Sequence, residues 1–198
     1  MTKSNTFAYH YGGKTYINLT NRCNCSCSFC LRQNANGVTD QSLWLEKEPS
    51  VEEVIAQLNE KGVIGNEVVF CGYGEPTFKL DELLTLSKRI KILNKNIKVR
   101  LNTNGLGSAL HGKNIVPLLA KNIDAISVSL NAPNVKRYDD ICKSSFGLKA
   151  FDYIIAFTKE CVKAKIDTTM SVVSGLTIEE INECKKIAAD LGAKFRQR

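Results

Sequence analysis

The segment Tyr16–Cys30, YINLTNRCNCSCSFC, joins a β-prone stretch directly to a cluster of cysteines. Its apolar and β-branched start predicts a strand, after which Cys23, Cys25, Cys27 and Cys30 follow within eight residues. Three of them have the spacing C-x3-C-x2-C, which allows the thiolates of one loop to reach a single metal centre. Soft sulfur ligands select iron–sulfur clusters, zinc or copper(I). The segment therefore predicts a metal site at the carboxyl end of a strand.

Short apolar, β-branched runs recur along the rest of the chain and predict further strands. Six strands are expected, at Tyr16–Thr20, Glu67–Cys71, Lys98–Thr103, Ala125–Leu130, Thr168–Val173 and Lys194–Arg198. A β-prone stretch at Phe7–Tyr11 precedes the first of them, and Gly12-Gly13 supplies the positive φ angles of a tight turn. We therefore expect a short hairpin at the start of the chain.

The segments between the expected strands have the sequence signals of helices. Capping boxes at Ser50–Glu53 and Thr177–Glu180 predict two helix starts. The apolar stripes of the last two helices include Cys161 and Cys184, which we expect in the core. Helices that alternate with short strands are typical of an α/β fold with a parallel sheet. Six strands are too few for a closed eight-stranded barrel, so a doubly wound sheet and a partial barrel both fit.

The composition is that of an ordinary globular protein, and we expect one core domain over residues 1–198. The chain is 43% hydrophobic and 24% charged, and it has no apolar run of roughly the 18 residues that a membrane span needs. The amino-terminal stretch also lacks the apolar segment of a secretory signal, so we expect a cytoplasmic protein. The net charge of +7 is compatible with an acidic partner such as nucleic acid.

A structural zinc site competes with an iron–sulfur cluster for the cysteine loop. It would use all four cysteines, Cys25 included, and the protein would be a non-catalytic module that binds a partner. The loop lacks the paired, separated C-x2-C knuckles of common zinc folds. A closed zinc loop would also leave the remaining motifs of the chain unexplained.

Further motifs lie at the carboxyl ends of the next three expected strands. GYGEP (Gly72–Pro76), NTNG (Asn102–Gly105) and SVSLN (Ser127–Asn131) follow in order along the chain. Together with the cysteine loop and the aromatic Phe29 before its last cysteine, they resemble the radical SAM superfamily over essentially the whole chain. With this resemblance we expect the partial (β/α)6 TIM-like barrel, built from a parallel six-stranded sheet with a short N-terminal hairpin strand.

The resemblance implies two cofactors, a [4Fe–4S] cluster held by Cys23, Cys27 and Cys30, and S-adenosylmethionine bound to the remaining iron. One electron from an external reductant would cleave S-adenosylmethionine to a 5′-deoxyadenosyl radical, which would abstract hydrogen from a substrate. The motifs do not identify that substrate. The open side of a partial barrel favours a protein or a nucleic acid over a small molecule. A member that binds the cluster without turnover is a further alternative, against which the intact cysteine triad argues.

The resemblance also implies roles for residues at the ends of the second and third strands. Gly74 and Glu75 would contact the methionine amino group of S-adenosylmethionine, through a backbone carbonyl and a side-chain oxygen. Asn102 and Asn104 would reach the methionine carboxylate or the substrate.

Residues elsewhere would complete the binding of S-adenosylmethionine. Ser129 and Asn131 would hydrogen-bond the ribose hydroxyls, and Phe29 would lie against the adenine. Arg196 would contact the carboxylate if its side chain points inward. We further expect Cys142, in the loop RYDDICKSSFG, to donate or accept a hydrogen atom during turnover.

A narrower resemblance rests on four stretches, YINLTNRC, LWLEKEPS, VVFCGYGEPT and the terminal KFRQR. They are similar to the TatD-associated radical SAM proteins, which are encoded beside TatD-type nucleases and have no established reaction. This similarity implies a functional link to a TatD-type nuclease and a context of nucleic-acid or protein processing.

Overall fold

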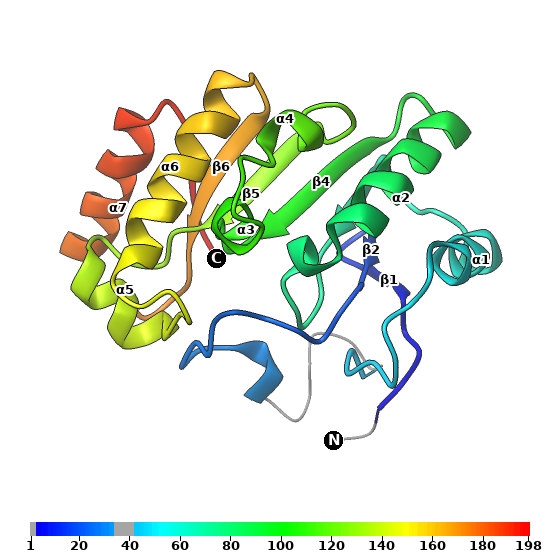
Figure 1. The fold of residues 1–198 in the computed structure, drawn as a ribbon, viewed down its shortest axis with the longest axis horizontal. Helices are drawn as coiled ribbons and strands as arrows, with labels where there is room; N and C mark the ends of the chain where they lie inside the picture. The colour runs from blue at the N-terminus through cyan, green and yellow to red at the C-terminus, as the bar shows by residue number, and fades with distance from the viewer. Residues whose placement is uncertain (1–2, 34–41) are drawn as a thin grey trace. The chain divides into compact units, whose positions relative to one another are not determined.

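The computed structural model describes residues 3–33 and 42–198, in which strands and helices alternate along the chain (Figure 1). The strands are β1 (Ala8–Tyr11), β2 (Lys14–Ile17), β3 (Glu67–Phe70), β4 (Lys98–Thr103), β5 (Ala125–Ser129), β6 (Asp167–Val172) and β7 (Lys194–Gln197). The helices are α1 (Val51–Lys61), α2 (Leu80–Leu93), α3 (Gly107–Leu110), α4 (Val116–Leu119), α5 (Val135–Cys142), α6 (Lys149–Lys163) and α7 (Ile178–Asp190), with 3-10 turns η1 (Leu31–Gln33) and η2 (Pro76–Lys79).

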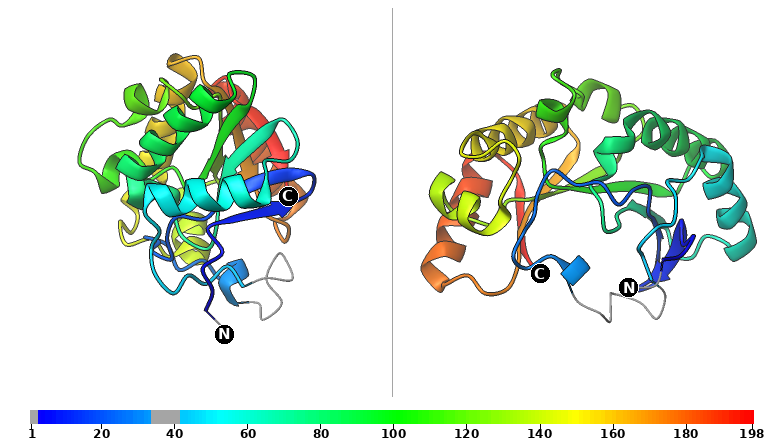
Figure 2. Two further views of the ribbon diagram at one scale, coloured as in Figure 1. Left: turned by 90° about the vertical axis from the view of Figure 1, so that its right-hand side faces the viewer. Right: turned by 60° about the horizontal axis from the view of Figure 1, so that its bottom comes forward.

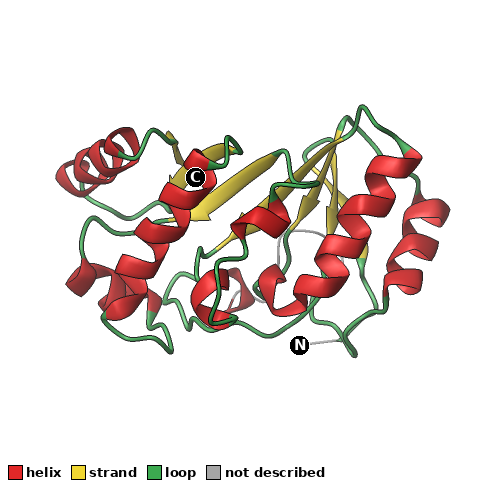
Figure 3. Cartoon of the chain, turned by 45° about the horizontal axis from the view of Figure 1, so that its top comes forward, coloured by secondary structure: helices red, strands yellow, loops and turns green. Residues whose placement is uncertain are grey.

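The chain divides into two compact units, which are described separately. Unit 1 contains the described residues of Met1–Cys23 and Cys30–Asn102, and unit 2 contains Asn24–Phe29 and Thr103–Arg198. In each unit the helices lie along one face of the strands (Figure 3). The cysteine loop therefore leaves unit 1 after Cys23, contributes six residues to unit 2, and returns at Cys30.

The strands of unit 1 pair in the order β1-β2-β3-β4. Strand β1 is antiparallel to β2, and the two-residue turn between them has φ angles of 55° and 73° at Gly12 and Gly13, so the expected hairpin is confirmed. Strands β2, β3 and β4 run parallel, with Ile17 opposite Phe70 and Phe70 opposite Leu101. Figure 2 shows α1, in cyan, alongside this hairpin. The carboxyl ends of these parallel strands lead into the cysteine loop and into GYGEP.

The strands of unit 2 pair in the order β5-β6-β7, and all three are parallel. Helices α6 and α7 pack on β6, as Figure 1 shows in yellow and orange. The expected capping boxes at Ser50–Glu53 and Thr177–Glu180 are both formed and begin α1 and α7. Cys161 and Cys184 are fully buried in α6 and α7, as expected for core residues.

Two expectations about local structure are wrong. The first parallel strand ends at Ile17 instead of Thr20, and the residues that follow bond to another segment of the chain: the side-chain amide of Asn18 donates to the Leu43 carbonyl, 2.8 Å away. Cys142 is the last residue of α5 and not part of a loop, because Asn134 caps that helix by accepting a hydrogen bond from the Arg137 backbone N–H. Within the described part of the chain, no helix combines the length and apolar character needed to cross a membrane.

Candidate functional site

The three cysteines with the C-x3-C-x2-C spacing are all half-buried, and they are divided between the two units. Cys23 and Cys30 belong to unit 1, whereas Cys27 belongs to unit 2 together with Phe29. Within the described residues, neither unit by itself groups three His, Cys, Asp or Glu side chains that could hold a metal.

The fourth cysteine of the loop, Cys25, has a different environment. Its residue is only 4% exposed, and its Sγ lies 3.8 Å from the Tyr138 hydroxyl and 3.7 Å from Nδ2 of Asn104. Burial raises the pKa of Tyr138, and the thiols of Cys25 and Cys142 raise it further. The Tyr138 hydroxyl therefore stays protonated and can donate to sulfur. The Cys25 thiol is thus directed into unit 2 among polar donors.

The loop rests on the end of α5 through its backbone. The N–H of Ser26 donates to the Cys142 carbonyl at 3.1 Å, and the N–H of Ser28 donates to the Ile141 carbonyl at 2.9 Å. The last carbonyls of a helix have no partner within the helix, so they are available to such donors. The helix that the sequence reasoning missed is therefore the support on which the cysteine loop lies.

The GYGEP turn of unit 1 is fixed by its glutamate. Glu75 is 3% exposed, and its Oε1 accepts hydrogen bonds from the backbone N–H of Thr77 at 3.1 Å and from the Thr77 hydroxyl at 2.8 Å. Glu75 thereby caps η2, which begins at Pro76. Its own N–H donates to the Arg22 carbonyl at 2.8 Å. The turn is thus hydrogen-bonded to the residue that directly precedes Cys23.

Gly74 is required by the packing of the backbone in the same place. A Cβ atom at Gly74 would lie 2.7 Å from the Arg22 carbonyl oxygen and closer still to the Thr20 carbonyl oxygen. Both neighbours are backbone atoms, which cannot rotate away. The glycine of this motif therefore serves the contact between two segments of the chain, independently of any ligand.

The two asparagines at the end of β4 differ in their surroundings. Oδ1 of Asn102, in unit 1, is buried and has no hydrogen-bond partner within the described residues. A buried acceptor of this kind is suited to a donor group on a bound molecule. Asn104, in unit 2, donates from Nδ2 to Oδ1 of Asn24 at 2.6 Å and accepts at Oδ1 from the N–H of Leu106 at 3.0 Å. Its side chain therefore holds the cysteine loop.

The strand ends of unit 2 bring together two expected residues and one that the sequence reasoning did not assign. Nη2 of Arg198 donates to Oγ of Ser129 at 3.2 Å and to Oδ1 of Asn131 at 3.4 Å. The parallel register places Arg196 opposite Ser171 and Ser171 opposite Ser129, so the three share one face of the sheet. The two-residue spacing between Arg196 and Arg198 was the available signal for the missed arginine.

The candidate hydrogen-atom donor, Cys142, is fully buried. Nδ2 of Asn131 lies 4.0 Å from its Sγ, so the thiol lies beside an expected ribose-binding residue.

Comparison with known proteins agrees with this arrangement of motifs. A family model described as the radical SAM superfamily matches residues 17–188. A protein of Methanosarcina acetivorans named "Probable GTP 3′,8-cyclase" is 27% identical over 183 residues, which are 90% of this chain and 51% of that protein. The chain thus spans about half the length of the curated relatives it matches.

Solved structures share the fold. SuiB of Streptococcus suis, bound to precursor peptide SuiA, has a TM-score of 0.66 at 22% identity. The match covers 92% of this chain and 38% of the SuiB chain. Native anSMEcpe with bound AdoMet has a TM-score of 0.63 at 19% identity, and the match covers 92% of this chain and 50% of the anSMEcpe chain. These likenesses confirm the expected α/β fold of the partial TIM-barrel type.

Proposed function

The chain belongs to the radical SAM superfamily, and on that premise we propose that it is an enzyme acting by radical chemistry on a macromolecular substrate. The cofactors of the superfamily are a [4Fe–4S] cluster and S-adenosylmethionine. When both are bound, the cluster supplies an electron, and S-adenosylmethionine supplies the radical that this electron releases. The residues of the chain would hold the cofactors, orient them and exclude water.

We assign the cluster to Cys23, Cys27 and Cys30. Three thiolates suit an iron–sulfur cluster and leave one iron for S-adenosylmethionine, so the donor set fits the group. The burial of Cys25 against Tyr138 supports its exclusion from this set.

A single observation carries this function, the 2.8 Å hydrogen bond from the Glu75 N–H to the Arg22 carbonyl. It ties the turn that would bind the methionine amino group to the residue before the first cluster ligand. Gly74 and Glu75 would present a carbonyl and a carboxylate to that amino group. The unpartnered Oδ1 of Asn102 is a further acceptor in unit 1.

Residues of unit 2 would bind the remainder of S-adenosylmethionine. Ser129 and Asn131 would bond the ribose, and Phe29 would lie against the adenine. Arg198, which donates to both ribose-binding side chains, is better supported than Arg196 as the arginine that orders this site.

The substrate we propose is a protein or a nucleic acid. The curated relatives are named as GTP cyclases, and SuiB, which shares the fold, is bound to a precursor peptide. The net charge of +7 favours an acidic polymer. Polymer binding at low salt that is lost at high salt is the expected result, and its absence would favour a small molecule.

Two finer assignments are part of the proposal. The stretches around Cys23, Trp44, Gly74 and Phe195 support a place among the TatD-associated members, with a functional link to a TatD-type nuclease. Cys142 would exchange a hydrogen atom during turnover, and C142A that retains full product formation would refute that role. The alternative of a zinc module has no support from the comparisons.

The test is anaerobic reconstitution with iron and sulfide, reduction with dithionite, and electron paramagnetic resonance with and without S-adenosylmethionine. We expect a cubane signal that changes when S-adenosylmethionine is added, together with 5′-deoxyadenosine. Protein that binds one zinc, forms no cluster and releases no 5′-deoxyadenosine would refute the proposal.

A further inference from the structure

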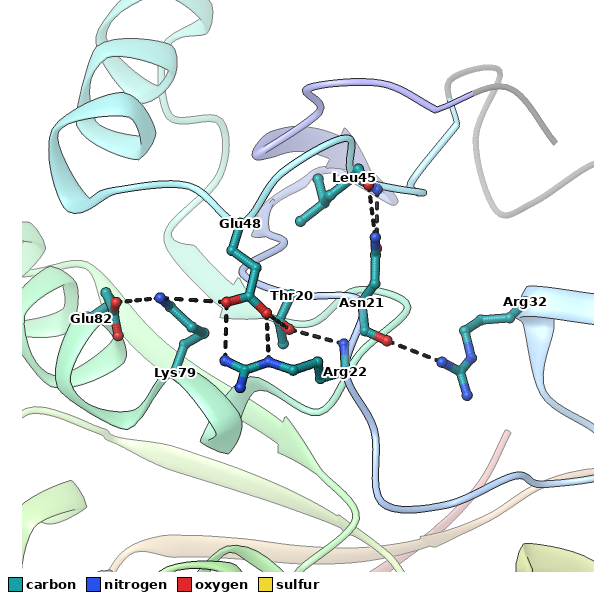
Figure 4. A network of polar contacts seen from close by, with 8 residues as sticks. All are labelled: Thr20, Asn21, Arg22, Arg32, Leu45, Glu48, Lys79 and Glu82. Atoms are coloured by element: carbon teal, nitrogen blue, oxygen red, sulfur yellow. Dashed lines mark hydrogen bonds and ion pairs between the residues drawn. The ribbon is translucent and has the colours of Figure 1, made fainter.

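A network of polar contacts in unit 1 surrounds Glu48, which lies in the segment before α1 (Figure 4). Its Oε1 accepts from the Thr20 hydroxyl at 2.5 Å and from Nε of Arg22 at 2.7 Å, while Oε2 accepts from Nη2 of Arg22 at 3.0 Å. Nζ of Lys79 lies 3.6 Å from the same carboxylate and also pairs with Glu82. One carboxylate thus contacts two residues that precede Cys23 and a lysine of η2.

Asn21, which lies between Thr20 and Arg22 in the sequence, makes a second set of hydrogen bonds. Nδ2 of Asn21 donates to the Leu45 carbonyl at 2.8 Å, and its Oδ1 accepts from the Leu45 N–H at 3.0 Å. The carbonyl of Asn21 accepts from Nη1 of Arg32 at 3.1 Å. Figure 4 shows the two dashed lines that join Asn21 to Leu45. The side-chain amide of Asn21 thus bonds to both the N–H and the carbonyl of Leu45, as the backbone of a neighbouring strand would.

Three consecutive residues, Thr20, Asn21 and Arg22, are therefore each fixed by the segment 45–48. The Thr20 hydroxyl also accepts from the N–H of Arg22 at 2.9 Å, which closes a local turn. The carbonyl oxygens of Thr20 and Arg22 lie against Gly74, and that of Arg22 accepts from the Glu75 N–H. Any shift of this backbone therefore displaces the turn that packs against it.

The bonds to Glu48 are of the stronger kind. Arg22 binds it through two nitrogens, and a two-pronged arginine–carboxylate pair constrains geometry as well as adding energy. The Glu48 side chain is 31% exposed and that of Lys79 is 17% exposed, whereas that of Arg22 is 55% exposed, so water screens the Lys79 charge less than the Arg22 charge. An isolated ion pair on the surface would contribute little.

We propose that Glu48 and Asn21 are positioning residues, which fix the backbone of Thr20–Arg22 and through it the Gly74–Glu75 turn. The inference rests on the proposed function in one respect, that this turn binds S-adenosylmethionine. In this role neither residue would bind a cofactor, and both would act through the Arg22 carbonyl. The segment LWLEKEPS acquires a role by this proposal, because Leu45 and Glu48 lie within it.

The test compares Glu48→Gln with Glu52→Gln, a matched control in the same unit. Glu52 also pairs with an arginine, Arg89, at 2.5 Å, but its side chain is 76% exposed and the pair does not touch residues 20–22. Hydrogen–deuterium exchange of the cluster-free protein is followed in peptides covering residues 20–24 and 72–78. Affinity for S-adenosylmethionine is then measured after reconstitution.

We expect E48Q to accelerate exchange in both peptides by about tenfold and to weaken S-adenosylmethionine binding by about five- to tenfold, because one charge-assisted pair is lost. E52Q should match the wild type in both measurements. Asn21→Asp, which replaces the donor to the Leu45 carbonyl with a charged acceptor of the same shape, is the second variant if E48Q does not fold, and it should accelerate exchange in the same peptides.

The outcomes separate the two proposals. Exchange in E48Q and N21D equal to that in the wild type would overturn the positioning role, even if the wild type cleaves S-adenosylmethionine. Wild-type protein that binds no S-adenosylmethionine would refute the proposed function, while the exchange of the cluster-free variants would still decide whether Glu48 and Asn21 fix this backbone.

Discussion

Replacing Gly74 with alanine separates the two reasons for a glycine in the GYGEP turn. If the glycine only allowed a ligand to approach, the cluster-free protein would tolerate a methyl group there. The structure predicts that it does not, because the added Cβ would lie 2.7 Å from the Arg22 carbonyl oxygen. Gly74 is not among the glycines with positive φ, so the expected cost is steric and not conformational.

The magnitude follows from this distance. An ordinary contact begins near 3.4 Å, so the Arg22 carbonyl must retreat by about 0.7 Å and the nearer Thr20 carbonyl by more than that. That shift would lengthen the 2.8 Å bond from the Glu75 N–H to about 3.5 Å, beyond hydrogen-bonding range. The lost bond costs about 1 kcal/mol and the overpacking about 1–3 kcal/mol. For a chain of this size the sum lowers Tm by about 5–15 °C.

Thermal unfolding of the cluster-free protein, followed by circular dichroism, measures this effect. Gly112→Ala is the control, because its φ of 61° disfavours alanine while nothing lies within 4 Å of the added Cβ. It reports the conformational cost of a glycine replacement without a collision, about 1–2 kcal/mol. A G74A protein with Tm within 2 °C of the wild type would refute the packing argument.

Three further predictions concern the cysteines and the arginine at the end of the chain. Cys27→Ser should abolish the cubane signal, whereas Cys25→Ser should keep wild-type iron content because that thiol faces Tyr138; equal loss in both would contradict the assignment. R198A should raise the Kd for S-adenosylmethionine about tenfold without lowering iron content, and an unchanged Kd would remove this arginine from the site. Burial raises the pKa of Cys161 and Cys184 to about 12 from 9.0, so the unfolded chain releases these protons first. The contribution of these two thiols to the free energy of unfolding should therefore be constant below pH 9 and fall by about 1.4 kcal/mol per pH unit for each thiol above it, and C161A should remove half of that loss in urea titrations between pH 9 and 10, below the pH at which the unfolded chain's tyrosines ionise.

Features that depend on near neighbours in sequence were predictable. The hairpin follows from Gly12-Gly13, and the starts of α1 and α7 follow from capping boxes that span three residues. Helix α5 was missed because it has no capping box or long apolar stripe, and only the Asn134 side chain indicates its start.

The candidate site was predictable in its membership but not in its contacts. Motif spacing selects the cysteines and the strand-end residues. Local patterns cannot reveal that Cys25 meets Tyr138, 113 positions later, or that Arg198 reaches Ser129, 69 positions earlier. The hydrogen bond from Asn104 to the cysteine loop was missed for the same reason, because its partner Asn24 lies 80 positions away.

The backbone bonds between the cysteine loop and α5 have a consequence for how freely this loop can vary. Ser26 and Ser28 are exposed and bond to α5 mainly through their N–H groups, with the Ser28 hydroxyl adding a longer bond of 3.4 Å to the Ile141 carbonyl, so most amino acids should be interchangeable at either position. Proline is the exception, because it has no N–H to donate. Insertion or deletion of a residue in the loop would move each N–H group after that point away from the α5 carbonyl to which it donates. The loop is therefore tolerant of substitution and intolerant of a change in length, which is the pattern expected of a motif defined by spacing.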